Sequence, residues 1–442
     1  NMDMLMDVQI PVLVELGRTE LLMQDVLSLN TGAIIELDSL AGEPVKMTIR
    51  GKIIAYGEVV VVDDYRLDVS WEAEIARAGL RIVSIDDMAT RSHQCDLLVD
   101  PKWRGAETSG GYQSLVPQGC HRLLGPDYAL LSAEYGTSLK KREGSPDNLF
   151  RVLFTLGGGG DLNILADLLE VLQQQPDYDA NVIQLQAVVG PSSRNRQRLQ
   201  QLAEQGAVEL LVGKRSLFEA YCSASLVVGA AGGTVYELVR LRIPMISFSM
   251  SDNQQTPQSW LDEIGRYFHL PSCLDDDVRR LAQLILLVKE QYARVQRLFS
   301  ESKVQLDGRG VERVAAEVCQ LFSNNDCVMQ SPERAEQNGS ERRGYHLRPV
   351  KDQDINHYLQ SRNLQLNRGN MIEERAIRPI VHYRWWFQTQ RDSFLLTKDG
   401  EAKLYIWQEI VQVSGGGTGL EAGLSVVKGA STKTLSMRYP SN

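Results

Sequence analysis

Between residues 63 and 325, short apolar runs alternate with longer stretches in which apolar residues recur every three or four positions. The runs that predict buried strands lie at 80–85, 151–156, 183–189, 226–229 and 244–249. Helical spacing follows at 162–173 and 234–240, and an amphipathic helical pattern covers 278–323. Strands that alternate with helices are typical of a parallel sheet whose two faces are both covered. We therefore expect an α/β region across 63–323.

The flanking regions have different patterns. Residues 1–62 hold short β-type runs separated by turn signals, at 10–16, 33–37, 46–49 and 58–62. Residues 324–344 are polar and predict a linker. Residues 345–442 are aromatic in their middle and rich in Gly, Ser and Thr at their end. The chain is therefore predicted to be multidomain, with a small β-rich module first and a third domain at 345–442.

Composition narrows the function classes. A chain of 442 residues has room for two to four domains. Its formal net charge is −9 and no basic stripe carries interleaved aromatics, so we expect no nucleic-acid partner. Its six cysteines form no CxxC pair, which favours neither a zinc site nor a disulfide framework and suits a reducing cytoplasm. No apolar run reaches 18 residues, so we expect no transmembrane segment.

The first candidate for ligand chemistry is a glycine run that follows a strand and precedes a helix. Gly157, Gly158 and Gly159 lie in this run. Glycine lets the backbone approach a ligand closely, and a helix N-terminus offers free N–H groups to a phosphate. The run lacks the GxGxxG spacing of dinucleotide-binding folds. A permissive turn without a ligand is an equally good interpretation of this run alone.

The second candidate repeats that arrangement. Gly232, Gly233 and Thr234 lie between an apolar run and a helix, where a diphosphate would meet the helix N-terminus. Glu237 lies one turn further on, where its carboxylate would accept hydrogen bonds from ribose hydroxyls. The alternative for Glu237 is a first-turn glutamate that the helix dipole favours.

Five stretches of the central region resemble one family in the same order. They are VVVDDY at 60–65, IDDMA at 85–89, HQCDLLVD at 93–100, LLGPDYALL at 123–131 and GAAGGTVYEL at 229–238. An Ile-Pro pair at 243–244 and Asp-Asn-Gln at 252–254 follow. The whole resembles the UDP-2,4-diacetamido-2,4,6-trideoxy-β-L-altropyranose hydrolases of pseudaminic acid synthesis, which have a GT-B-like fold.

The resemblance implies removal of UDP from an amino-sugar nucleotide by water, with no cofactor and no metal. It implies that the nucleotide is held by Gly232, Gly233, Thr234 and Glu237. Asn253 and Gln254 would face the ligand cleft. That family begins with a segment that carries its catalytic histidine, and residues 1–62 contain no histidine. His93 is a substitute candidate for the acid–base role, against a surface or structural role.

The first 62 residues resemble a different family. The matching stretches are IPVLVELGRT at 10–19, DVLSL at 25–29, GAIIELD at 32–38, LAGEPV at 40–45 and GEVVVV at 57–62. They resemble the carboxy-terminal domain of the flagellar motor switch protein. This implies a ring or intertwined dimer, C-ring partners and a place at the cytoplasmic face of the basal body. Residues 59–64 fit both families, so a true fusion and a joining error both remain open.

Residues 345–442 resemble a third family in part. YHLRPVKDQD at 345–354, Arg362-Asn363 and HYRWW at 382–386 resemble an amino-sugar acetyltransferase of the GNAT superfamily. The acetyl-CoA loop of that superfamily has no match here, so we expect an incomplete and inactive acyltransferase lobe. Trp385 and Trp386 are interpreted as core packing, with a substrate clamp as the alternative.

These patterns lead to three hypotheses. The first is a cytoplasmic UDP-amino-sugar hydrolase-like protein of flagellin glycan synthesis, active or impaired by loss of the catalytic segment. The second is a structural protein of the motor switch involved in motility and chemotaxis. The third is a nucleotide-sugar-binding lobe without turnover.

Overall fold

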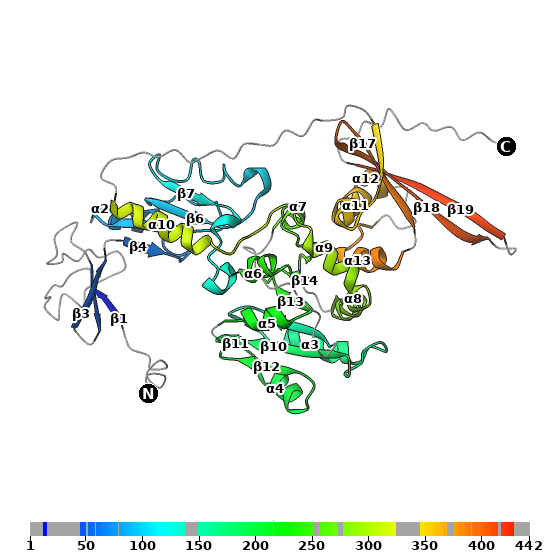
Figure 1. Ribbon diagram of the computed structural model, residues 1–442, viewed down its shortest axis with the longest axis horizontal. Coiled ribbons are helices and arrows are strands. Elements are labelled where there is room, and N and C mark those ends of the chain that lie inside the picture. Colours follow the sequence, from blue (N-terminus) through cyan, green and yellow to red (C-terminus); the bar gives the residue numbers. More distant parts are fainter. Residues whose placement is uncertain are drawn as a thin grey trace. The chain divides into compact units, whose positions relative to one another are not determined.

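A computed structural model describes most of the chain. The described residues are 12–15, 45–49, 52–57, 59–77, 79–137, 149–214, 216–250, 256–272, 277–323, 345–368, 375–389, 391–413 and 417–427. They fall into two compact units, one from 1–130 with 309–328 and the other from 131–308 with 329–442. Figure 1 labels the helices and strands of both units. In the described residues no helix has the length and apolarity needed to cross a membrane.

The first unit begins with three short antiparallel strands. β1 (Val12–Glu15), β2 (Val45–Ile49) and β3 (Lys52–Gly57) form a sheet in the order β1-β2-β3. These strands agree with the β-rich pattern predicted at 10–16 and 46–49. The run predicted at 33–37 lies outside the described residues.

A four-stranded parallel sheet follows in the same unit. Its strands are β4 (Val59–Val62), β5 (Arg81–Ile85), β6 (Leu97–Asp100) and β7 (His121–Leu124), in that order. α2 (Val69–Arg77) connects β4 to β5, and α10 (Gly310–Ser323) returns to cover the sheet. Side chains alternate between two cores: Ile82 and Leu98 face one, while Val83, Leu97 and Val99 face the other, against α10.

The second unit is built on a six-stranded sheet in which every pair is parallel. Its strands are β8 (Phe150–Thr155), β10 (Ile183–Val189), β12 (Glu209–Val212), β13 (Leu226–Ala230), β14 (Met245–Phe248) and β15 (Phe268–Leu270). Their order is β12-β10-β8-β13-β14-β15. The parallel sheet predicted from the sequence is therefore confirmed. Four of the five predicted strands are β8, β10, β13 and β14 of this sheet, and the fifth is β5 in the parallel sheet of the first unit.

Helices cover both faces of this sheet (Figure 1). α3 (Asn163–Gln173), α4 (Gln197–Glu204), α8 (Val278–Glu290) and α9 (Tyr292–Ser300) share a core with Val152, Phe154 and Val228. Alternate strand residues such as Leu153 and Val227 point to the opposite face. That side carries α5 (Phe218–Ser223) and α6 (Thr234–Leu241). A shorter helix, α7 (Gln258–Glu263), precedes β15.

The last part of the second unit is an antiparallel sheet with three helices. β16 (Tyr345–Pro349), β17 (Asp392–Lys398), β18 (Glu401–Val413) and β19 (Gly417–Val426) pair in sequence order. α11 (Ile355–Asn363), α12 (Gln365–Arg368) and α13 (Pro379–Gln388) lie between β16 and β17.

These helices share the core of the six-stranded sheet. The Phe268 ring of β15 lies 5.4 Å from the ring of Tyr383 and 5.8 Å from that of Phe387. Arg294 of α9 donates to Asp352 over 2.7 Å. Trp386 is buried and donates to the same carboxylate, which agrees with the core-packing interpretation. α13 therefore packs against β15 inside the second unit, and the domain boundary predicted near residue 345 stays a prediction.

Candidate functional site

The strand order of the second unit reverses between β8 and β13. From β8 the chain passes to β10 and β12 on one side of the sheet, and later to β13, β14 and β15 on the other. In open α/β sheets, ligands bind outside the carboxyl ends of the strands at such a reversal, because the two loops diverge there and leave a crevice. Both glycine clusters predicted from the sequence follow these two strands. The topology therefore brings them together at one edge of the sheet.

The first glycine turn has backbone angles that favour glycine. Gly157 has φ +75° and Gly160 has φ +136°. The Gly157 N–H donates to the Thr155 Oγ1 atom over 3.1 Å. The turn ends in β9 (Gly159–Asp161), which pairs with β11 (Ser192–Arg194). Nothing lies within 4 Å of an added Cβ at Gly157 or Gly158, so this part of the turn borders open space.

Gly190 is a required glycine that the sequence analysis did not single out. A Cβ at Gly190 would lie 2.6 Å from the backbone oxygens of both Gly157 and Gly158. The end of β10 therefore packs directly on the back of the first glycine turn. In the sequence, Gly190 is marked by nothing more than the Gly190-Pro191 pair after an apolar run. Such a pair is common in loops of any kind.

The second glycine turn leads into α6. Thr234 is the first helical residue, and the Gly233 backbone before it already has helical angles of φ −54° and ψ −29°. The first N–H groups of a helix have no intrahelical acceptor and carry the positive end of its dipole. An added Cβ at Gly233 meets nothing within 4 Å. The α6 N-terminus therefore has the room and the donors for an anionic group.

Glu237 is held by a residue far away in the sequence. The Tyr135 hydroxyl donates to the Glu237 carboxylate over 2.9 Å. Burial raises the pKa of Glu237, and the Tyr135 hydrogen bond partly opposes this rise. Tyr135 is itself fixed by an edge contact with Phe218 at 5.0 Å and by Arg240, which donates to its backbone oxygen over 2.7 Å. The predicted ribose contact of Glu237 stays a prediction.

Removing that hydroxyl tests the arrangement. We expect Tyr135→Phe to destabilise the second unit by about 1 kcal/mol, because the partly buried Glu237 carboxylate loses its donor. Urea unfolding of the purified chain would measure the loss. Tyr178→Phe is the control, since Tyr178 is a half-buried tyrosine of the same unit, whereas Tyr135 is fully buried, and no described hydrogen bond joins Tyr178 to Glu237. Equal stability of both variants would contradict the assignment.

Two predicted ligand contacts, Asn253 and Gln254, lie in the segment 251–255, outside the described residues. Their predicted place in the cleft stays a prediction. Ser249 and Thr256 flank this segment, and both line a pocket at the carboxyl end of β14.

His93 belongs to the first unit and is almost fully buried, with 3% of its surface exposed. Its Nδ1 atom lies 2.9 Å from Glu72 Oε1, and its Nε2 atom lies 3.9 Å from Asp86 Oδ1. Burial alone would lower the pKa of His93, but the hydrogen bonds and charges of the two carboxylates outweigh burial and raise it to about 9. His93 is thus a protonated bridge between buried carboxylates at neutral pH. Its catalytic role stays a prediction.

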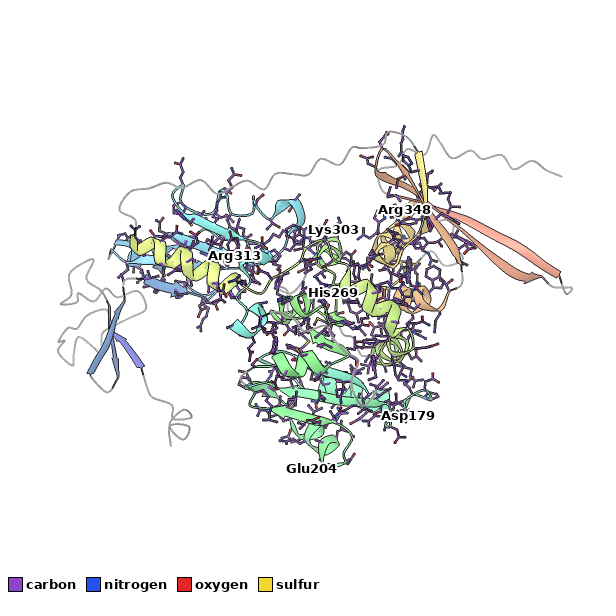
Figure 2. The ribbon with its side chains drawn as sticks, viewed as in Figure 1. Asp179, Glu204, His269, Lys303, Arg313 and Arg348 are labelled. Atoms are coloured by element: carbon purple, nitrogen blue, oxygen red, sulfur yellow. The ribbon has the colours of Figure 1, made fainter. Side chains whose placement is uncertain are left out.

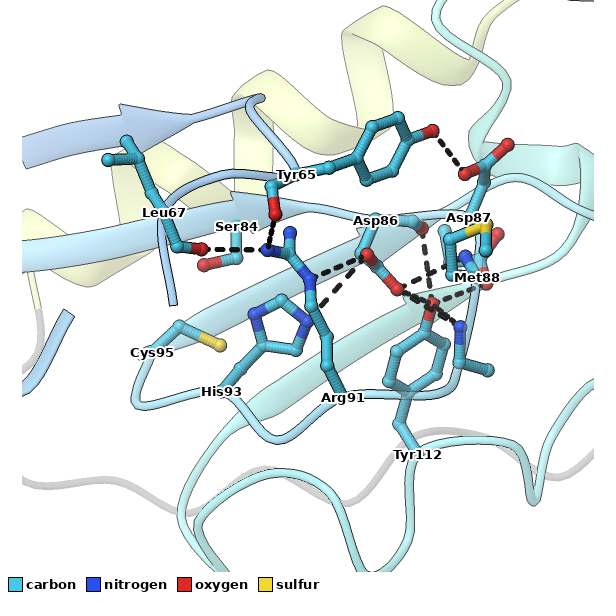
Figure 3. Close-up of polar contacts among 12 residues, drawn as sticks. Tyr65, Leu67, Ser84, Asp86, Asp87, Met88, Arg91, His93, Cys95 and Tyr112 are labelled. Carbon is cyan, nitrogen blue, oxygen red and sulfur yellow. Dashed lines mark hydrogen bonds and ion pairs between the residues drawn. The ribbon is translucent and has the colours of Figure 1, made fainter. Parts of the chain in front are cut away.

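A network of polar side chains surrounds this bridge at the ends of β5 and β6 (Figure 3). Asp86 accepts hydrogen bonds from the Tyr112 hydroxyl at 2.7 Å and from Arg91 Nε at 3.1 Å. Tyr112 also lies 2.8 Å from Asp100, which pairs with Arg104 at 2.5 Å. Burial would raise the pKa of Asp86, but His93 and Tyr112 outweigh it and hold that pKa well below its usual range. Asp86, Asp100 and Glu72 thus face the cations of Arg91, Arg104 and His93, while His93 Nε2 has no hydrogen-bond partner among the described residues.

Comparison with known families identifies the beginning of the chain. Residues 3–67 match the family model described as Type III flagellar switch regulator (C-ring) FliN C-term. Over 64 residues the chain is 55% identical to the flagellar motor switch protein FliN of Borreliella burgdorferi and 50% identical to the flagellar motor switch phosphatase FliY of Bacillus subtilis. Each match covers 14% of this chain, with 57% of the first relative and 17% of the second, so the chain spans less than two thirds of their lengths.

Two solved structures align with part of this chain at low similarity. The S. aureus MnaA–UDP structure aligns at a TM-score of 0.40 and 12% identity, over 60% of this chain and 75% of that one. Acinetobacter baumannii MurG aligns at 0.36 and 11%, over 60% and 74%. Likeness of this extent carries no conclusion about activity. The sequence match is the specific finding: residues 3–67 of this chain are similar to the carboxy-terminal domain of FliN.

Proposed function

We propose that the second unit binds a UDP-amino-sugar, with the diphosphate at the N-terminus of α6 and the glycine turn at 157–160 beside it. The observation that carries the proposal is the placement of both glycine turns at the point where the strand order reverses. Gly232, Gly233 and Thr234 supply backbone donors, and Glu237 is the candidate for the ribose hydroxyls.

We further propose that residues 63–323, which belong to both units, descend from the UDP-amino-sugar hydrolases of pseudaminic acid synthesis. The sequence motifs at 60–65, 85–89, 93–100, 123–131 and 229–254 support this, as do two parallel sheets in separate units. Hydrolysis would transfer the sugar from UDP to water, and a base would take the proton of that water. The base is unassigned: His93, the candidate from the sequence, is buried, and its raised pKa keeps it protonated at neutral pH, so it cannot take that proton there.

The test is release of UDP from UDP-2,4-diacetamido-2,4,6-trideoxy-altrose by the full chain, with UDP binding measured by calorimetry in the same preparation. Turnover would support the hydrolase. Binding without turnover would leave a nucleotide-sugar lobe separated from its chemistry. If neither occurs, the nucleotide-sugar proposal is wrong.

A charge placed at the α6 N-terminus tests the phosphate site directly. We expect Gly233→Asp to weaken UDP binding at least tenfold, because its carboxylate would repel the diphosphate. The fold should persist, since Gly233 is exposed and an acidic residue at a helix N-terminus is favourable. Gly233→Asn has the same shape without the charge and serves as the control. Equal UDP affinity of the two variants would place the diphosphate elsewhere.

A second function is favoured by a different observation, the FliN-type match at 3–67. We propose that this segment attaches the chain to C-ring proteins at the cytoplasmic face of the flagellar basal body. Co-sedimentation of the chain with purified basal bodies tests this. A truncated chain that begins at residue 59 should stay in the supernatant, whereas equal sedimentation of both chains would remove the segment from that role.

A further inference from the structure

A pocket of about 760 Å³ lies at the carboxyl ends of β14 and β15 in the second unit. One wall comes from the sheet and includes Ser249 and His269. The opposite wall comes from α11 and α13 and includes Asn356, Gln360 and Tyr383. Pockets of this size are typical of small-molecule sites. None of the nucleotide-sugar contacts predicted from the sequence lies on α11 or α13.

The described lining of this pocket is neutral. It consists of hydroxyl, carboxamide and aromatic groups with proline and leucine side chains, and His269 is its one titratable nitrogen base. Burial lowers the pKa of His269 to about 4, so its imidazole is uncharged at neutral pH. His269 lies inside the unit (Figure 2). Its Nδ1 atom is 3.0 Å from Ser247 Oγ. Such a lining suits a neutral polar ligand and provides no cation for a phosphate or carboxylate.

The two walls are held in place by buried hydrogen bonds. The Tyr383 hydroxyl of α13 donates to Asn356 Oδ1 at 2.9 Å and to the His269 backbone oxygen at 3.3 Å. Asn356 Nδ2 donates to Asp262 Oδ1 at 2.7 Å and to the Tyr267 backbone oxygen at 2.9 Å. The side chains of α11 and α13 are therefore tied to β15 and α7. A wall that is already ordered loses little conformational entropy when a ligand binds.

The pocket lies on the same sheet edge as the proposed phosphate site. The Ala231 N–H, just before Gly232, donates to the Phe248 backbone oxygen over 3.0 Å. The Ser249 N–H in turn donates to the Leu270 backbone oxygen over 3.2 Å. Neighbouring strands are about 4.8 Å apart, so the pocket begins roughly one to two strand spacings from the α6 N-terminus. A group covalently attached to a diphosphate at α6 can reach it.

We infer that this pocket holds the sugar of the bound nucleotide sugar, and that α11 and α13 supply one of its walls. The inference rests on the proposed nucleotide-sugar function. The ligand class is a neutral acylamino sugar: Gln360 and Thr256, which line the pocket without being buried, meet its polar atoms, and the leucine and proline side chains meet its acyl methyl groups. The last segment of the chain thus contributes to sugar recognition whether or not it has an acyltransferase activity of its own.

The experiment compares UDP with UDP-N-acetylglucosamine by calorimetry on the full chain. Gln360→Trp would block the pocket, because Gln360 is exposed on its α11 wall. Gln200→Trp is the control, since Gln200 is equally exposed on α4 and does not line the pocket. We expect the nucleotide sugar to bind more tightly than UDP, and Gln360→Trp to remove that advantage while UDP affinity changes less than twofold. Gln200→Trp should change neither affinity.

Other outcomes are decisive as well. Unchanged sugar-dependent affinity in Gln360→Trp, or an equal loss for both ligands, would overturn the inference. If the unaltered chain does not bind UDP, the proposed phosphate site fails by itself. Saturation-transfer NMR with free N-acetylglucosamine then decides the pocket: transfer to its acetyl methyl group that disappears in Gln360→Trp supports the sugar site, and absence of transfer overturns it.

Discussion

Gly229→Ala is expected to unfold the second unit under conditions in which the unaltered chain is folded. A Cβ at Gly229 would lie 1.7 Å from the Thr155 backbone oxygen and 2.8 Å from its carbonyl carbon. Both positions belong to the two central strands, β13 and β8, which pair directly. Backbone atoms of a central strand cannot move aside as a flexible side chain can. We therefore expect a loss of about 3 kcal/mol or more, measured by urea unfolding.

The matched control for this prediction is Gly233→Ala in the turn that follows. Its Cβ meets nothing within 4 Å, and its backbone angles are helical, so its stability should change by less than about 0.5 kcal/mol. A Gly229→Ala variant as stable as Gly233→Ala would show that β8 and β13 do not approach each other this closely.

His93→Ala is expected to have the largest effect in the first unit. The substitution leaves the buried carboxylates of Glu72 and Asp86 without their shared cation. Removing one partner of a buried charge pair costs about 3–5 kcal/mol. Hydrogen–deuterium exchange by mass spectrometry would detect the loss as reduced protection across 69–124. His121→Ala is the control, because its side chain is 45% exposed and lies 3.7 Å from Glu317.

The same bridge predicts a pH dependence. The folded-state pKa of His93, about 9, lies above the ordinary value of 6.5, so protonated His93 stabilises the fold. This contribution, about 3 kcal/mol, is complete below pH 6.5 and is lost as the pH rises through about 9. Protection factors in 69–124, corrected for intrinsic exchange, should fall over that range. His93→Ala should abolish the fall, and a fall that persists in the variant would assign it to another group.

Much of the second unit was predictable because its elements are encoded locally. Ile183–Val189 is a continuous apolar run between turn signals, and it forms β10 with those bounds. The residues from 162 to 173 have helical spacing and form α3. A buried strand must be apolar on both faces, and a covering helix must be apolar on one stripe, so both leave a clear pattern. The glycine turns could be found for the same reason, since they interrupt strong patterns.

Contacts between distant residues were not predictable in this way. Tyr135 and Glu237 are 102 positions apart, and no property of either residue identifies the other. In the sequence, Gly190 resembles any loop glycine. The structure shows that it is required, because the end of β10 packs against the first glycine turn. The four valines at 59–62 fit both families in the sequence, and pairing with β5 is what places them in the parallel sheet.

The sequence by itself determined the parallel α/β class, the switch-type segment at the amino terminus and the two glycine turns, because each depends on neighbouring residues. The tertiary structure decided which strands are adjacent, and so brought the two turns to one edge of the sheet. It also decided that His93 is a buried bridge rather than an exposed base. Finally, it placed α11 and α13 against β15. The aromatic packing and the neutral pocket there depend on contacts between residues more than 80 positions apart in the sequence.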